Sequence, residues 1–152
     1  MFLLKFNWDV LITSPLNRAK QTAEIINYKL KLPIYEMEEF LERGFGDAEG
    51  MDMEERISKF PDGIIPNQED RETLKRRVMD GIKNINEKFP NKKVLLVAHG
   101  GVINSILAIL SGGEIGSGKT KLMNACISNI HFIEKEWKIK DYNQVTHLSQ
   151  IQ

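Results

Sequence analysis

The residues whose types and spacing first suggest chemistry are His99, Gly100 and Gly101. They follow an uninterrupted apolar run over residues 94–98, which is typical of a strand buried on both faces of a parallel sheet. A second apolar run, over residues 102–110, favours a buried helix. The two glycines allow a sharp turn and a close approach of the backbone to a ligand. The pattern therefore predicts a histidine at a strand-to-helix junction, beside free backbone N–H groups and the positive end of a helix dipole, where anions bind.

A similar junction is predicted earlier in the chain. Residues 9–13 are typical of a buried strand, after which Ser14 fits the N-cap and Pro15 the first position of a helix. Arg18 falls in the first turn of this helix, where a positive charge opposes the helix dipole. Its planar guanidinium could bind a phosphate through two hydrogen bonds, and a surface ion pair explains its position equally well. In open α/β sheets, ligands bind at the carboxyl ends of the strands, where both junctions lie.

The rest of the chain is expected to complete an α/β fold with a mostly parallel sheet. A helical period runs from Leu74 to Phe89, with Asn67 as the expected N-cap and Asp70 as its capping-box partner. The other expected elements are an acidic, glycine-bearing loop over 35–50, short helices over 51–60 and 121–126, and strands over 127–133 and 137–139 that form a hairpin about Lys135. The 152 residues suit a single domain, residues 1–152.

Composition narrows the function classes. The chain has 21 Lys plus Arg and 21 Asp plus Glu, so its formal net charge is zero, whereas nucleic-acid-binding proteins usually carry a basic excess or stripe. The basic cluster at residues 75–77 is expected to form a solvated helix face. No apolar run has the length of a membrane span, and residues 1–8 are too short for the apolar part of a signal peptide. The single cysteine, Cys126, fits a reducing compartment, so a cytoplasmic protein without a nucleic-acid or membrane partner is expected.

Residues 113–120 match the phosphate-binding loop G-x-x-x-x-G-K-[ST] at every fixed position. That motif requires a strand before the loop and a helix after it. Residues 102–110 are rich in Ile and Val, but only three residues separate them from the preceding strand, and a parallel neighbour needs a longer crossover. Just over thirty residues follow Lys119, which leaves little room for a further parallel strand. A flexible loop is therefore favoured, and ATP or GTP binding is the second hypothesis, from a different function class.

Two separated segments, residues 14–23 (SPLNRAKQTA) and 97–103 (VAHGGVI), closely resemble the histidine phosphatase superfamily, the phosphoglycerate-mutase-like proteins. Residues 41–50 are similar to the loop that the family places between them, and residues 143–148 are similar to the end of its bacterial phosphatase branch. The resemblance implies a three-layer α/β/α fold with a mostly parallel sheet. It also implies transfer of a phosphoryl group to a histidine and then to water or another hydroxyl, with no metal and no cofactor.

The resemblance also implies roles for individual residues. Arg18 matches a phosphate-binding arginine, and His99 matches the family's second histidine, which polarises the phosphoryl oxygens with Gly100 beside it in the phosphate site. Glu42 is the best match to the general acid that protonates the leaving oxygen, and a plain surface carboxylate explains it equally well. The two histidines that follow His99 in the sequence are expected to be structural.

The sequence departs from the family at its start. The family opens with a strand that ends in Arg-His-Gly, whose histidine is the nucleophile, and no histidine precedes His99 here. The missing strand belongs beside residues 94–98, so backbone groups are expected to be left unpaired there. Three explanations are open: the reading frame begins upstream of Met1, the chain is an inactive phosphate-binding relic, or a partner chain fills the gap. The first is favoured because Arg18, Glu42 and His99 are all retained.

The expected function is phosphomonoester hydrolysis through a phosphohistidine, in a chain that lacks the nucleophile and is inactive as it stands. The alternatives are an inactive phosphate-binding or interaction protein, and nucleotide binding at Gly113–Thr120. The expected partner is a small phosphorylated substrate or free phosphate, and a homodimer is open. The sequence names no leaving group and does not separate a phosphatase from a mutase.

Overall fold

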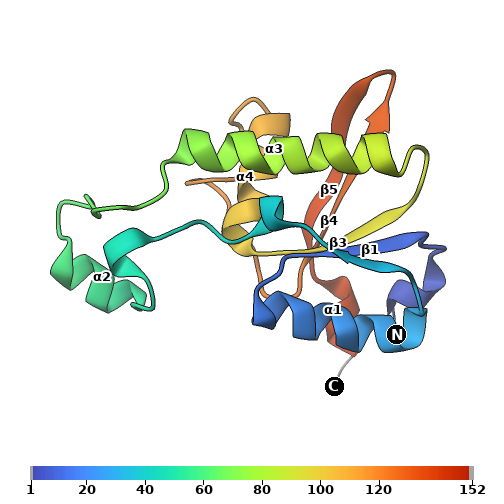
Figure 1. Ribbon diagram of the computed structural model, residues 1–152, viewed down its shortest axis with the longest axis horizontal. Coiled ribbons are helices and arrows are strands. Elements are labelled where there is room, and N and C mark those ends of the chain that lie inside the picture. Colours follow the sequence, from blue (N-terminus) through green and yellow to red (C-terminus); the bar gives the residue numbers. More distant parts are fainter. Residues whose placement is uncertain (1, 151–152) are drawn as a thin grey trace.

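The computed structural model describes residues 2–150, and this part of the chain forms a parallel sheet, a separate antiparallel sheet and four α-helices (Figure 1). The parallel sheet has the order β2-β1-β3, with bounds β1 Val10–Thr13, β2 Ile34–Glu36 and β3 Val94–Val97. The antiparallel sheet consists of β4 Ile127–Ile133 and β5 Glu136–Gln144. The helices are α1 Asn17–Leu30, α2 Met53–Lys59, α3 Arg71–Lys88 and α4 Gly100–Leu110.

Helices cover both faces of the parallel sheet, with α1 on one face and α3 and α4 on the other (Figure 1). Successive residues of a strand point to opposite faces. Val10 and Ile12 therefore pack with α3 and α4, whereas the fully buried Leu11 between them points toward α1. The buried residues of α1 are Ala19 and Ala23, whose small side chains let the helix lie close to the sheet. The three-layer α/β fold predicted from the sequence is confirmed.

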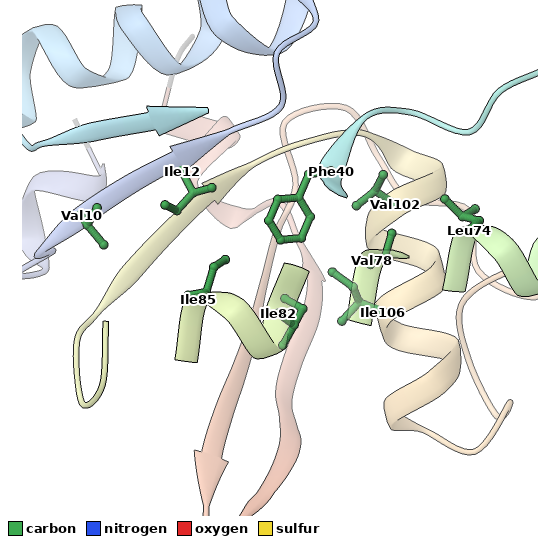
Figure 2. Packing of buried hydrophobic residues seen from close by; sticks show 9 residues of the cluster. All are labelled: Val10, Ile12, Phe40, Leu74, Val78, Ile82, Ile85, Val102 and Ile106. Atoms are coloured by element: carbon green, nitrogen blue, oxygen red, sulfur yellow. The ribbon is translucent and has the colours of Figure 1, made fainter. Parts of the chain in front are cut away.

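Phe40 anchors the chain two residues before Glu42. Its side chain is fully buried and lies among residues of β1, α3 and α4 (Figure 2). Gly81 of α3 makes room for the ring, because a Cβ atom there would lie 2.7 Å from the Phe40 Cζ atom. The cluster around Phe40 contains Val10, Ile12, Leu74, Val78, Ile82, Ile85, Val102 and Ile106.

In the part of the chain that the structure describes, the outer edge of β3 has no strand beside it. The Ser14 N–H donates to the Val97 carbonyl at 3.0 Å, and the Asp9 N–H donates to the Lys93 carbonyl at 2.8 Å. In residues 93–97, the backbone carbonyls of the odd-numbered residues therefore point toward β1, and those of the even-numbered residues point to the opposite side. Across residues 2–150, no strand pairs with that second edge, because β4 and β5 form a sheet of their own. It is the edge at which the family resemblance places a further strand.

The helix after β1 begins later than the sequence predicts. α1 starts at Asn17 with Leu16 as its N-cap, and not with Ser14 and Pro15. Ser14 remains tied to the sheet, because its backbone N–H continues the β1–β3 ladder to Val97. Its hydroxyl accepts the Leu16 N–H at 3.3 Å, so it satisfies a backbone donor just ahead of the helix. The predicted N-cap is therefore wrong, and the predicted helix is confirmed.

The start of α3 also differs from the prediction. Asp70 is the N-cap in place of Asn67, and its Oδ1 atom accepts the Thr73 N–H at 2.7 Å. Asn67 has a φ of 61° and donates through its Nδ2 atom to Asp47 at 3.1 Å. Its side chain therefore holds two loop segments together and is not available to cap a helix.

Elsewhere the predicted elements are partly right. The expected loop over 35–50 overlaps β2, an exposed edge strand with no apolar alternation, and residues 121–126 form turns where a helix is predicted. The helix over 51–60 is confirmed as α2 and the hairpin as β4–β5, although β5 runs well beyond residue 139. α4 confirms the helix expected from the second apolar run. In the described part of the chain, no helix combines the length and apolarity needed to cross a bilayer.

Replacing Phe40 with alanine should lower the free energy of unfolding by about 3–5 kcal/mol, the usual cost of deleting a buried aromatic ring. The control is Ile57→Ala at a side chain that is 62% exposed, which should change stability by less than about 0.5 kcal/mol. Urea unfolding followed by circular dichroism measures both. Similar small losses in the two variants would contradict the anchoring role of Phe40.

Candidate active site

His99 lies where β3 passes into α4. It is the N-cap of α4 and is only 6% exposed. Its Nε2 atom lies 2.7 Å from the Oγ atom of Ser14, which is fully buried at the end of β1. Parallel pairing of β1 with β3 brings these residues together, because both strands end at the same edge of the sheet. The two strand-to-helix junctions are therefore joined by a hydrogen bond.

Arg18 is the second residue of α1, and its side chain is exposed. Among the described residues, its guanidinium forms neither a hydrogen bond nor an ion pair. Its charge nevertheless lowers the pKa of His99. Arg18 follows Ser14 by four residues, and the Ser14 hydroxyl contacts the His99 ring, so α1 begins at the edge of the sheet where His99 lies. No partner among the described residues competes with an anion for the Arg18 guanidinium.

Glu42 lies against the first turn of α4. Its Oε1 atom accepts the Arg43 N–H at 2.9 Å, and its Oε2 atom lies 3.4 Å from the Gly101 nitrogen. A Cβ atom at Gly101 would collide with the Glu42 carboxylate, so the second glycine is needed for this close approach. Gly100, the first residue of α4, is exposed beside it. A carboxyl group, an exposed backbone segment and His99 therefore meet at one helix terminus.

Arg77 of α3 holds the segment that carries Glu42. Its guanidinium donates to the carbonyls of Glu39 at 2.8 Å, Leu41 at 2.7 Å and Glu42 at 3.3 Å. It also binds the Glu69 carboxylate at 2.6 Å and 2.8 Å through two nitrogens. The expectation that residues 75–77 form a solvated face is therefore wrong for Arg77. It follows the buried Leu74 by three positions and precedes Gly81 by four, so a helical wheel would have placed it at the buried face.

The Glu69 carboxylate completes this arrangement. It also accepts the Gly44 N–H at 3.0 Å, so it ties the chain after Glu42 to α3. Hydrogen bonding to Arg77 is the main cause that lowers the pKa of Glu69, and the Gly44 N–H acts in the same direction. The ion pair therefore fixes the chain on both sides of Glu42.

The surroundings of His99 favour its neutral form. Burial is the main cause that lowers the pKa of His99, and the positive charges of Arg18 and Arg77 lower it further. The Glu42 carboxylate acts in the opposite direction. Positive charge, an imidazole and a carboxyl group around one helix N-terminus form a surface suited to a tetrahedral oxyanion and to proton transfer.

The other candidate residues lie outside this arrangement. His131 is exposed on β4, and His147 bonds to the Ala125 carbonyl at 2.9 Å and stacks on Phe2. Residues 113–120 follow a helix and precede turns, so the strand and helix required by the nucleotide-binding motif are not formed. The Lys119 Nζ atom donates to the carbonyl of Gly113 at 2.6 Å.

Arg77→Met should lower the free energy of unfolding by about 2 kcal/mol, because charge-assisted hydrogen bonds to Glu69 and three carbonyls are lost. Amide exchange at Gly44 and Gly101 should accelerate, since the segment around Glu42 loses its support. Arg76→Met is the matched control, because Arg76 is the exposed neighbour of Arg77 on the same helix. If the two variants behave alike in urea unfolding and amide exchange, the proposed support is refuted.

The lowered pKa of His99 should make the fold less stable in acid. An unfolded histidine takes up its proton near the ordinary pKa of 6.5, whereas folded His99 takes it up at lower pH. The unfolded chain then binds more protons, so the free energy of unfolding falls as the pH drops below about 6.5. His99→Gln should reduce this fall in urea unfolding measured from about pH 7 to about pH 5. An unchanged pH dependence would show that His99 is not the group responsible.

Known proteins resemble this chain in sequence and in fold. The sequence model of the histidine phosphatase superfamily (branch 1) matches residues 1–145. A Bacillus subtilis protein described as the uncharacterized phosphatase PhoE is 54% identical over 148 residues, which cover 97% of this chain and 77% of that protein. A metal-independent phosphoserine phosphatase of Arabidopsis thaliana is 31% identical, over 91% of this chain and 63% of that protein.

Solved structures agree with these matches. Bacillus stearothermophilus YhfR has a TM-score of 0.89 at 21% identity, over 97% of this chain and 79% of that chain. A mycobacterial glucosyl-3-phosphoglycerate phosphatase, solved with inorganic phosphate, has a TM-score of 0.78 at 21% identity, over 93% and 80% of the two chains. The structures establish the common fold, and the family match spans almost the whole sequence. The chain therefore belongs to the histidine phosphatase superfamily (branch 1).

Proposed function

We propose that this chain derives from a phosphatase of small phosphomonoesters that works through a phosphohistidine. The observation that supports it best is that the Ser14–His99 and Glu42–Gly101 contacts join both strand-to-helix junctions and a carboxylate at the start of α4. Arg18 lies in the first turn of the helix that follows Ser14. In this proposal Arg18, His99 and Gly100 bind the phosphoryl group. Glu42 is the general acid.

Each group has a separate task in the proposed reaction. The planar guanidinium of Arg18 binds two phosphoryl oxygens, and the backbone at Gly100 and the dipole of α4 favour the negative charge. His99 donates a hydrogen bond to a third oxygen, which stabilises charge during transfer. Glu42 gives a proton to the leaving oxygen. The attacking group is a further histidine, from which water then takes the phosphoryl group.

The attacking histidine is the part that this chain does not supply. The sequence has three histidines, and none precedes His99. His131 and His147 lie on the β4–β5 hairpin and in the short segment after it. The proposal is therefore that the 152 residues bind phosphate and phosphomonoesters but do not turn them over.

The relatives support the proposed substrate class. The Arabidopsis protein is described as a phosphoserine phosphatase that needs no metal, and phosphate is bound in the mycobacterial structure. The zero net charge of the chain supports a small phosphorylated molecule, rather than a nucleic acid, as the partner. A cytoplasmic location belongs to the proposal as well.

The proposal predicts binding without turnover. Calorimetry should detect the binding of inorganic phosphate or vanadate to the chain. Arg18→Ala should weaken this binding by at least about tenfold, the loss expected for charge-assisted hydrogen bonds. Lys29→Ala, at the other end of α1, should bind as wild type does. An aryl phosphate should not be hydrolysed at mildly acidic to neutral pH.

Three outcomes would count against parts of this proposal. Turnover that depends on His99 and leaves a phosphohistidine on this chain would overturn the statement about the nucleophile. Absence of any phosphate or vanadate binding would overturn the binding site. ATP binding that is lost in Lys119→Ala and unchanged in Arg18→Ala would favour the nucleotide-binding alternative instead.

A further inference from the structure

The buried hydroxyl of Ser14 has few groups with which it can form hydrogen bonds. Ser14 is fully buried at the end of β1. Its Oγ atom accepts the Leu16 N–H at 3.3 Å and lies 2.7 Å from the Nε2 atom of His99. Within residues 2–150, these are its two hydrogen-bond contacts. The first partner is a donor, so only the imidazole can accept the hydroxyl proton.

This limitation decides the state of the imidazole. A neutral histidine has one nitrogen that donates and one that accepts. If Nε2 accepts the Ser14 hydroxyl, the ring proton is on Nδ1. If Nε2 carried the proton instead, the buried Ser14 hydroxyl would have no acceptor, which is unfavourable. The contacts of Ser14 therefore select the Nδ1–H form of neutral His99.

The other ring nitrogen is free for a ligand. Among the described residues, the Nδ1 atom of His99 has no protein partner. In this part of the chain, the buried side-chain atoms that lack a partner are the Arg56 Nε and the Asn104 Oδ1 atoms, and the His99 Nδ1 atom is not one of them. Nδ1 is therefore reached by solvent. The charged groups that act on the ring are Arg18, Glu42 and Arg77, so the imidazole faces the same region as the proposed phosphate site.

We propose that Ser14 is a positioning residue that holds neutral His99 as its Nδ1–H tautomer, so that the imidazole donates to a phosphoryl oxygen without first gaining a proton. This inference rests on the proposed function, because it takes phosphate as the ligand of His99. The opposite tautomer would present a lone pair to the phosphoryl oxygen and would repel it. Since burial lowers the pKa of His99, the neutral ring is the form that meets substrate near neutral pH, and the choice of tautomer then matters.

The test is nitrogen-15 NMR of the histidine side chains in the 152-residue chain at about pH 8, where neutral imidazole dominates. In the wild-type protein, the His99 signals should show a proton on Nδ1 and a lone pair on Nε2. Finding the proton on Nε2 would overturn the inference, and this result needs no variant.

Variants extend the test to phosphate binding. Ser14→Ala should shift His99 toward the Nε2–H form, whereas Ser14→Thr keeps the hydroxyl and should keep the tautomer. Ser105→Ala is the matched control, because Ser105 is a buried serine on α4 that is 1% exposed. Relative to wild type, Ser14→Ala should bind phosphate about tenfold more weakly at about pH 8, and this ratio should fall toward one at about pH 5, as the fraction of His99 with protons on both ring nitrogens grows.

The outcomes separate this inference from the function on which it rests. If the wild-type tautomer is Nδ1–H and phosphate does not bind, the proposed function fails and the role of Ser14 in the tautomer stands. If phosphate binds and depends on Arg18, but Ser14→Ala leaves the tautomer or the affinity ratio unchanged, the inference about Ser14 is refuted and the proposed function stands. A loss of affinity that is equal at both pH values would indicate a purely structural effect of Ser14 and would also refute it.

Discussion

Adjacent parallel strands end at the same edge of a sheet, and the pairing of β1 with β3 carries two buried polar side chains to that edge. Ser14 follows β1 and His99 follows β3, and the hydrogen bond between them joins the two junctions. The helices α1 and α4 begin at this edge, with Arg18 in the first turn of α1 and Gly100 as the first residue of α4. The register of β1 against β3 therefore brings Ser14 and His99 together.

The position of Glu42 has a different physical cause. It lies outside regular secondary structure, so its position depends on anchors before and after it. Phe40 packs into the core ahead of it, and Arg77 and Glu69 hold the backbone around it through hydrogen bonds to α3. An irregular segment is thereby held close to α4, at the position where Gly101 leaves room for a carboxylate.

The parts that could be predicted from the sequence are those determined by local patterns. Apolar runs and their periods locate β1, β3, α3 and α4, and the glycines after His99 indicate the turn from β3 into α4. The parts that could not be predicted depend on contacts between distant segments. Ser14 does not cap α1, because the helix begins only at Asn17 and the Ser14 hydroxyl contacts His99 of a distant segment.

Arg77 and β2 also depend on contacts between distant segments of the chain. Arg77 stands in a run of basic residues, and only the folded chain shows that its partners are the carbonyls of residues 39, 41 and 42. The residues of β2 are all exposed and do not alternate between buried and exposed positions, so β2 is identified as a strand by its pairing with β1. The proposed role of Glu42 rests on family resemblance, since an acidic loop alone does not distinguish one carboxylate from its neighbours.

The central claim of the proposed function is that a single phosphate is bound between Arg18 and His99, and the membership of the chain in the histidine phosphatase superfamily supports it. The most direct measurement is a crystal structure of this protein grown with vanadate. The account predicts vanadate oxygens at about 3 Å from the Arg18 guanidinium and from the Nδ1 atom of His99. An anion bound at residues 113–120 or elsewhere, with Arg18 and His99 both out of contact, would contradict it.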